Sequence, residues 1–100
     1  MPGNKPSYKI FYSSDVIKYD LPKLDNRVQS IIKRKIEKLR DEPYMGLPLR
    51  GPLVKLYKIK VSRYRIVYEI EINELVIKII AIEKRGDSLV YEIVESRIKR

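Results

Sequence analysis

The sequence contains no cysteine, no histidine and no tryptophan among its 100 residues. Without cysteine the chain has no disulfide, no thiolate nucleophile and no zinc–cysteine site, which is compatible with a reducing cytosol. Without histidine it lacks the usual imidazole acid or base, so Ser–His and Cys–His nucleophile pairs are excluded. An enzyme built from this chain would have to move protons with lysine, arginine, tyrosine or carboxylate side chains.

Long apolar runs are also absent. No stretch reaches the length of a membrane span or of a secretory apolar segment followed by small residues. We therefore expect a cytoplasmic protein with no membrane segment. One hundred residues suffice for one domain and are too few for two independent cores. We expect residues 1–7, which hold two prolines and a glycine, to be a loose lead-in, and residues 8–100 to form that domain.

Positive charge is what the chain has in excess. It carries 22 Lys and Arg against 13 Asp and Glu, a formal net charge of +9, and both halves are net basic. With 44% apolar residues it is expected to fold, so the charge belongs to a globule and not to a disordered tail. The excess predicts a polyanionic partner: nucleic acid, an anionic membrane surface or an acidic protein.

The first half of the chain predicts a strand followed by helices. Residues 8–13 are aromatic and β-branched and predict a strand, after which a short helix can run until Pro22. The clearest helix spans Asp25 to about Arg40, capped by Asp25 or by a capping box of Asn26 with Gln29. Its cations lie largely off the apolar stripe and form either a solvated face or a nucleic-acid contact. They are Arg27, Lys33, Arg34, Lys35, Lys38 and Arg40.

The second half predicts a meander and a terminal helix. A proline- and glycine-rich loop over 43–52 precedes three segments rich in Ile, Val and Tyr, at 56–61, 64–72 and 75–82. The breaks between these strands have the length of tight hairpins. A loop then leads to a helix over 89–98. Its apolar stripe consists of Val90, Ile93, Val94 and Ile98. The predicted fold is a small α+β domain in which helices cover one face of an antiparallel sheet.

The first hairpin of the meander is strongly basic. Strand alternation puts Lys58 and Lys60 on one face, and a two-residue turn puts Arg65 directly opposite Lys60. Like charges directly opposite destabilise a sheet by up to about 1 kcal/mol. The arrangement therefore suggests an anion such as phosphate between them; the alternative is that these cations are solvated or partly neutralised by Glu69. The cations of this segment are Lys55, Lys58, Lys60, Arg63 and Arg65.

A second cationic point, Lys84-Arg85, follows the last strand. Because a meander orders its strands sequentially, this loop can close toward the face that carries Lys58 and Lys60. Tyr91 lies early in the terminal helix, near the edge of its apolar stripe. Alone it reads as a half-buried packing tyrosine, but with the converging cations it predicts a concave site for a polyanion.

These residues carry a family resemblance. Residues 57–61 (YKIKV) and 64–68 (YRIVY) resemble the strand pair of RelE, the ribosome-dependent mRNA-cleaving toxin of bacteria and archaea. From about residue 49 onward the resemblance is specific, whereas the earlier part matches in order and spacing only. Further matches lie at Leu49-Arg50-Gly51, Lys84-Arg85, Ser88, Val90-Tyr91 and Arg97-Ile98.

The resemblance implies a function and a set of site residues. It implies a type II toxin–antitoxin toxin that cuts mRNA in the ribosomal A site and blocks translation, without metal or other cofactor. An acidic RelB-like antitoxin would hold it in a hetero-oligomer. The active-site residues of the family fall on Lys58, Lys60, Arg65, Arg85 and Tyr91. Neighbouring cations expected to bind RNA are Lys55, Arg63 and Lys84.

Two departures and two alternatives accompany this interpretation. Glu83 stands where the best-known RelE proteins have glycine, and Asp87 where they have arginine, so the local positive potential is lower. One alternative is a ParE-like toxin, which inhibits DNA gyrase and lacks the catalytic cluster. The other is a basic nucleic-acid-binding module without chemistry.

RNA supplies its own nucleophile, the 2′-hydroxyl, so the predicted site has only to stabilise charge and move protons. Arg65 and Arg85 suit the phosphorane, because guanidinium is planar and can bind in a bidentate manner. Crowding by cations favours a neutral amine, so Lys58 or Lys60 can serve as general base. Tyr91 is another candidate base, or a stacking platform, and the sequence leaves acid and base unassigned.

Overall fold

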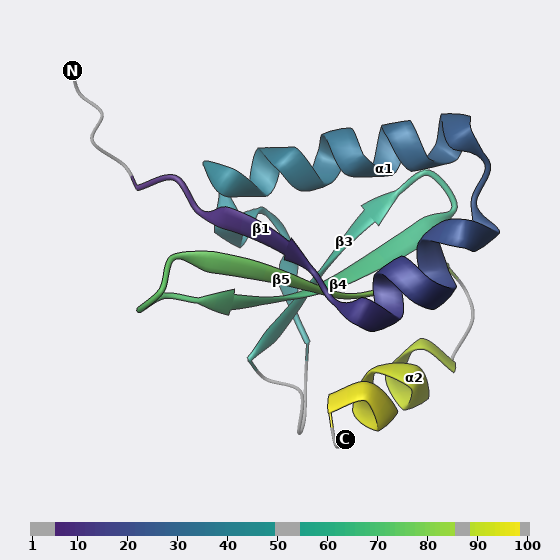
Figure 1. Ribbon diagram of the computed structural model, residues 1–100. Coiled ribbons are helices and arrows are strands. Elements are labelled where there is room, and N and C mark those ends of the chain that lie inside the picture. The colour runs from purple at the N-terminus through teal and green to yellow at the C-terminus, as the bar shows by residue number, and fades with distance from the viewer. Residues whose placement is uncertain (1–5, 50–54, 86–88, 99–100) are drawn as a thin grey trace.

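The computed structural model describes residues 6–49, 55–85 and 89–98, with the side chains of 89–91 outside that description. Five strands form one sheet in the order β1-β5-β4-β3-β2 (Figure 1). The strands are β1 (Lys9–Tyr12), β2 (Leu47–Pro48), β3 (Leu56–Val61), β4 (Tyr64–Glu71) and β5 (Val76–Lys84). The helices are α1 (Asn26–Glu37) and α2 (Leu89–Ile98). Short helical turns are η1 (Val16–Asp20), η2 (Leu21–Lys23), η3 (Lys38–Arg40) and η4 (Pro43–Met45).

The predicted α+β fold is confirmed, and the sheet differs from the prediction at one edge. Strands β2 to β5 pair in antiparallel fashion, whereas β1 lies parallel to β5, with Tyr12 opposite Ile79. The expectation of a wholly antiparallel sheet was therefore wrong for β1. The alternation within a strand defines its buried face, but the partner of β1 depends on where the intervening helices return the chain.

The helices lie on opposite faces of the sheet, as Figure 1 shows for α1 and α2. Ile32 and Ile36 of α1 belong to the larger core, whereas Val94 of α2 packs with Val67 and Ala81 in a second, smaller core. The prediction that helices cover one face only was wrong, because β4 and β5 carry apolar side chains on both faces. Both faces need a cover.

Each predicted helix has one detail that differs in the structure. The Oδ1 atom of Asp25 accepts the Val28 N–H at 2.8 Å, so Asp25 caps α1. The capping box with Gln29 is absent, because the Gln29 amide donates to the carbonyls of Leu21 and Leu24 at 2.6 and 3.2 Å. In α2 the predicted stripe ends early, since Ile98 is 48% exposed.

The predicted loop before β3 is partly ordered by Tyr68. Its hydroxyl donates to the Pro43 carbonyl at 2.7 Å and accepts the Gly46 N–H at 3.0 Å. A Cβ at Gly46 would lie 2.5 Å from the Lys58 carbonyl oxygen, so only glycine lets the loop approach β3 this closely. This approach sets β2 against the strand that carries the lysines. Within the described residues no helix is long and apolar enough to span a membrane.

Candidate functional site

The basic hairpin has the predicted register. Val61 lies opposite Tyr64, and Lys60 lies opposite Arg65, with Lys58 opposite Val67 one step along. The turn between the strands places Ser62 at a φ of 55°, in the left-handed region that tight two-residue hairpins require. The predicted opposition of two like charges across β3 and β4 is therefore confirmed.

A basic hollow lies at the turn end of this hairpin. It has a volume of about 580 Å³, and no acid is among the described residues that line it. The Arg85 N–H donates to the Arg63 carbonyl at 2.7 Å, and the Arg85 Nη1 donates to the Ser62 carbonyl at 3.2 Å. The predicted approach of Lys84-Arg85 is thus confirmed for the hairpin turn and Arg65, whereas Lys58 and Lys60, toward which it was also predicted, are not among the residues that line this hollow. The basic hollow is lined by Ser62, Arg63, Arg65, Lys84 and Arg85.

Arg65 carries a buried hydrogen-bond donor that is unsatisfied within the described residues. Its Nε is buried and finds no hydrogen-bond partner among the described residues. A buried donor left without an acceptor costs about 1–3 kcal/mol. A phosphate oxygen is an acceptor that satisfies this donor, and the surrounding cations favour its charge.

The two lysines of the predicted cluster line a different hollow. This edge hollow, about 240 Å³ in volume, lies where β3 continues beyond the short β2. Lys60, which lines the edge hollow, is the cross-strand partner of Arg65, which lines the basic hollow. The sequence did not single out Lys35 of α1 for this place, because nothing local distinguishes it from the other cations of its helix. The edge hollow is lined by Lys35, Met45, Gly46, Leu47, Lys58, Ile59 and Lys60.

Two of the predicted site residues stand apart from these hollows. Lys55 lines neither of them and shares a third hollow with Glu69. Burial raises the pKa of Glu69, and the positive charges of Lys78 and Lys55 oppose that rise. Tyr91 falls in the first turn of α2, and its side chain lies outside the part of the chain that the structure describes.

Glu83 lies beside the site but turns toward a neighbouring acid. In the register it is the partner of Arg65, yet it lines a separate hollow with Asp20, Lys23 and Lys84. Burial raises the pKa of Glu83 to about 6, helped by a hydrogen bond with the Asp20 carboxyl and by that group's charge. Glu83, one of the two acids that depart from the family pattern, is therefore not among the residues that line the basic hollow, and Asp87 lies outside the described residues.

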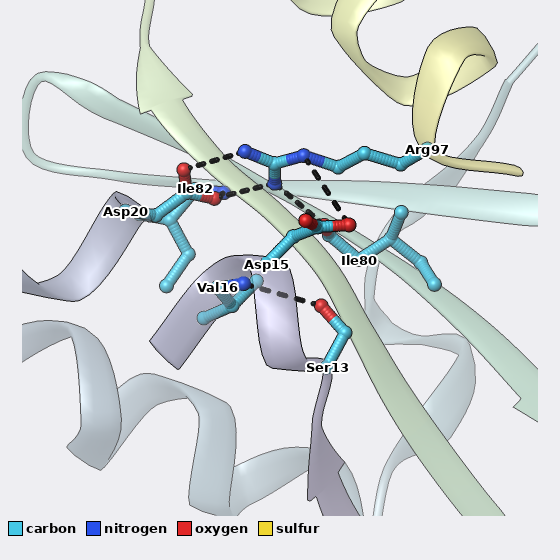
Figure 2. Close-up of polar contacts among 7 residues, drawn as sticks. All are labelled: Ser13, Asp15, Val16, Asp20, Ile80, Ile82 and Arg97. Atoms are coloured by element: carbon cyan, nitrogen blue, oxygen red, sulfur yellow. Dashed lines mark hydrogen bonds and ion pairs between the residues drawn. The ribbon is translucent and has the colours of Figure 1, made fainter. Parts of the chain in front are cut away.

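A buried ion pair that the sequence analysis did not anticipate joins α2 to the sheet. Arg97 Nη1 and Nη2 each contact a different carboxylate oxygen of Asp20 at 2.8 Å, and Nη1 also donates to the Ile80 carbonyl at 2.9 Å. The same Asp20 accepts the Ile82 N–H at 2.8 Å, and Asp15 lies 4.0 Å from Arg97 Nε (Figure 2). The hydrogen bond to Asp20 raises the pKa of Arg97, which stays charged. No local sequence pattern around Asp20 predicts its ion pair with Arg97.

Comparison with known proteins identifies the class. Residues 10–89 match the family model of the ParE toxin of the type II toxin–antitoxin system parDE, so the chain belongs to this toxin family. Within it the chain is a RelE-like toxin. It is 33% identical over 95 residues to an Escherichia coli RelE-like toxin protein, covering 92% of this chain and 98% of that one.

Solved structures agree with this assignment. A mutant of Escherichia coli RelE in the free state, in which two arginines are replaced by alanine, matches with a TM-score of 0.76. It is 29% identical, over 92% of this chain and 98% of its own. The archaeal RelE of the RelE–RelB complex from Pyrococcus horikoshii OT3 matches with a TM-score of 0.66 and 25% identity, over 82% and 99%.

Proposed function

We propose that this toxin acts in the cytoplasm as a metal-independent endoribonuclease that cleaves mRNA in the ribosomal A site and so stops translation. The observation that carries the proposal is the basic hollow. Among the residues that the structure describes, it gathers Arg65 and Arg85 with no lining acid, and the buried Nε of Arg65 has no acceptor. Such a hollow suits a phosphate whose negative charge grows during reaction.

The arginines would stabilise the phosphorane formed when the 2′-hydroxyl attacks the adjacent phosphorus. Preorganised donors aimed at developing charge are usually the largest catalytic contribution. The Ser62 carbonyl holds the Arg85 guanidinium in place before substrate arrives, which lowers the cost of orienting it. Arg65 brings a buried donor that has no partner among the described residues, so a hydrogen bond to a phosphate oxygen would satisfy it.

Proton transfer falls to Lys58, Lys60 or Tyr91 in this proposal. One of them takes the proton of the 2′-hydroxyl, and an acid of the same set returns a proton to the 5′-oxygen that leaves. Unperturbed lysine and tyrosine side chains are poor bases at neutral pH, so free RNA should be cut slowly. The ribosome would raise the cleavage rate by presenting the mRNA in the reactive geometry.

The partner in this proposal is an acidic RelB-like antitoxin. RelE-type toxins from Mycobacterium tuberculosis and Pyrococcus horikoshii have been solved as complexes with RelB antitoxins. The net charge of +9 suits an acidic partner that covers the basic hollow. We further propose that residues 8–100 form one toxin domain, which holds every element of the site.

The test replaces Arg65 and Arg85 one at a time by alanine. Each variant should lose growth arrest on expression and should lose the codon-positioned cuts that primer extension detects on ribosome-bound mRNA. Lys18→Ala removes one positive charge from η1, away from the hollows, and should keep both activities. An Arg85→Ala variant with full toxicity would refute the mechanism.

A ParE-like gyrase inhibitor is the second candidate, because the matching family model is that of ParE. Primer extension separates the two functions, since a gyrase poison leaves no codon-positioned cuts but stabilises cleaved DNA in a gyrase supercoiling assay. A module that only binds nucleic acid would give neither result and would show strongly salt-dependent RNA binding.

A further inference from the structure

A hollow next to the basic hollow has no part in the cleavage step proposed above. This mixed hollow lies where β5 ends and has a volume of about 330 Å³. Ligand sites in proteins typically measure roughly 300–1,000 Å³, so the mixed hollow is large enough for a small group. It shares Lys84 with the basic hollow, and the two hollows therefore adjoin. The polar and aromatic residues that line it are Asp20, Lys23, Tyr64, Glu83 and Lys84.

The register of β4 and β5 fixes the two hollows side by side. Arg65, which lines the basic hollow, lies opposite Glu83, which lines the mixed hollow. One step along, Tyr64 of the mixed hollow lies opposite the shared Lys84. Directly opposite residues of antiparallel strands have their Cβ atoms about 4.5–5.5 Å apart. When a phosphate of RNA occupies the basic hollow, an adjacent base is therefore within reach of the mixed hollow.

Glu83 is the carboxylate of the mixed hollow that can turn to a ligand. Both oxygens of Asp20 are already engaged, by Arg97 and by the Ile82 N–H (Figure 2). The hydrogen bond between the Glu83 and Asp20 carboxyls requires a proton, which is largely lost above the Glu83 pKa of about 6. At neutral pH Glu83 is thus a partly buried acceptor beside a second negative charge. N–H donors of a ligand would offset this unfavourable pairing.

Tyr64 and Lys23 add the other features of a nucleobase site. Tyr64 is partly buried, and aromatic side chains stack on the bases of single-stranded RNA. Lys23 lies near Glu83, since burial raises the pKa of Glu83 and the charge of Lys23 opposes that rise. The mixed hollow therefore brings together a stacking surface, a carboxylate and a positively charged donor.

The bases of RNA differ in the edge that they present to such a set of groups. Guanine carries its N1–H and N2–H₂ donors side by side, with the O6 acceptor next to them. Adenine and cytosine place a ring-nitrogen acceptor beside their amino group, and uracil places its N–H between two carbonyls. A carboxylate accepts both donors of guanine and repels the acceptors of the other bases, so this chemistry selects guanine.

We propose that the mixed hollow is a nucleobase subsite of this toxin: Glu83 accepts the N1–H and N2–H₂ of a guanine beside the cleaved phosphate, Lys23 donates to its O6, and Tyr64 stacks on its ring. The inference rests on the proposed function and adds a base preference to it. The preference belongs to the toxin itself and should therefore be present in RNA binding without the ribosome.

The test measures the affinity of the toxin for short RNAs that differ in one base. The RNAs are pentamers with uracil on both sides of a central guanine, adenine, cytosine or uracil, and their 2′-O-methyl groups prevent cleavage. Fluorescence anisotropy at neutral pH should show that the parent chain binds the guanine pentamer about 10-fold more tightly than the others. Equal affinity for all of them would overturn the inference.

Glu83→Gln should change the preference. The glutamine amide presents one donor and one acceptor, which match those of adenine, so the preference should move from guanine to adenine. A gain of affinity for adenine cannot come from unfolding. Glu71→Gln makes the same exchange on β4, in the hollow that holds Lys55 and Glu69, and should keep the preference for guanine. Tyr64→Leu should weaken binding of every pentamer alike, because stacking tolerates any base.

An unchanged preference for guanine in Glu83→Gln would also overturn the inference. Cleavage on programmed ribosomes, with the base on either side of the cut varied, tests the proposed function separately. A parent chain that binds the guanine pentamer selectively but leaves ribosome-bound mRNA intact would overturn the proposed function and support the subsite. A parent chain that cuts mRNA but binds all pentamers equally would overturn the subsite alone, so the two failures are distinguishable.

Discussion

Tyr68 shows at the scale of one residue how the site is built on a buried polar contact. Its ring is fully buried in the larger core, while its hydroxyl reaches the Pro43 carbonyl and the Gly46 N–H. Burial raises the pKa of Tyr68 to about 12, so the hydroxyl stays neutral and keeps donating over the working pH range. One side chain thus fixes the conformation of the loop that places β2 beside β3.

Replacing Tyr68 by phenylalanine should destabilise the fold. The change keeps the ring but leaves the Gly46 N–H and the Pro43 carbonyl without their partner, which should cost about 1–3 kcal/mol of unfolding free energy. Urea denaturation followed by circular dichroism measures the loss. Tyr44→Phe is the matched control, since that ring is 54% exposed, and it should change little. Equal stability of the two variants would show that the hydroxyl contacts contribute nothing.

Glu83 gives a pH dependence with a definite sign. Its pKa is raised from 4.5 to about 6 in the folded chain, so the folded state holds this proton more tightly than the unfolded state. Stability should therefore fall as pH rises from about 4.5 through 6. Because the carboxyl is partly exposed and solvent screens it, the contribution should stay below about 1 kcal/mol.

The measurement compares Glu83→Gln with the parent chain by urea denaturation at pH 4.5 and pH 7. The variant cannot ionise beside Asp20, so its stability relative to the parent should improve at the higher pH. Taking the difference between the two chains cancels the titration of the other carboxyl groups. A difference that is the same at both pH values would contradict the raised pKa.

At the scale of elements, local sequence patterns predicted where helices and strands lie. They did not predict which distant elements pair with one another. The terminal helix and β3 have the predicted bounds, because alternation and helical spacing are local properties. The opposition of Lys60 and Arg65 was predictable for the same reason, since a short turn fixes the register. The parallel β1–β5 pair and the Asp20–Arg97 ion pair join residues far apart in the sequence, and no spacing rule predicts them.

The hairpin turn at Ser62 offers a test at this scale. Its φ of 55° costs a residue with a Cβ about 1–2 kcal/mol, most of all a β-branched one. Ser62→Val should therefore lower the unfolding free energy, and Ser62→Gly should keep or slightly raise it. Thermal unfolding of the two variants and of the parent chain measures their order of stability. Equal melting temperatures for the valine and glycine variants would mean that the turn can change its type freely.

At the scale of the whole molecule, part of the excess positive charge is concentrated around the two hollows. Four cations line the basic hollow, and three more line the edge hollow on the other side of the Lys60–Arg65 pair. The cations of α1 adjoin this surface through Lys35. The positive surface is therefore wider than the set of residues proposed for RNA cleavage, which suits a polyanion longer than one phosphate.

Binding to RNA should depend on salt in proportion to the phosphates contacted. Each contact with a single strand contributes about 0.7 to the slope of log affinity against log salt. Lys84→Ala should lower that slope by about this amount in a fluorescence anisotropy titration with an RNA that carries 2′-O-methyl groups and cannot be cut. Lys18→Ala, which removes equal charge from η1, should leave the slope unchanged. The same slope for both variants would show that only net charge matters.

The facing cations of β3 and β4 also set the balance between stability and activity. Lys60 and Arg65 repel each other when the site is empty, at a cost of a few tenths to about 1 kcal/mol. Any anion that settles between them removes this cost and adds its own binding free energy to the folded state. The repulsion lowers the stability of the free toxin. A substitution that removed one of the two charges would raise the unfolding free energy and weaken anion binding at the site. Heat resistance and toxicity should therefore be selected in opposite directions at this pair.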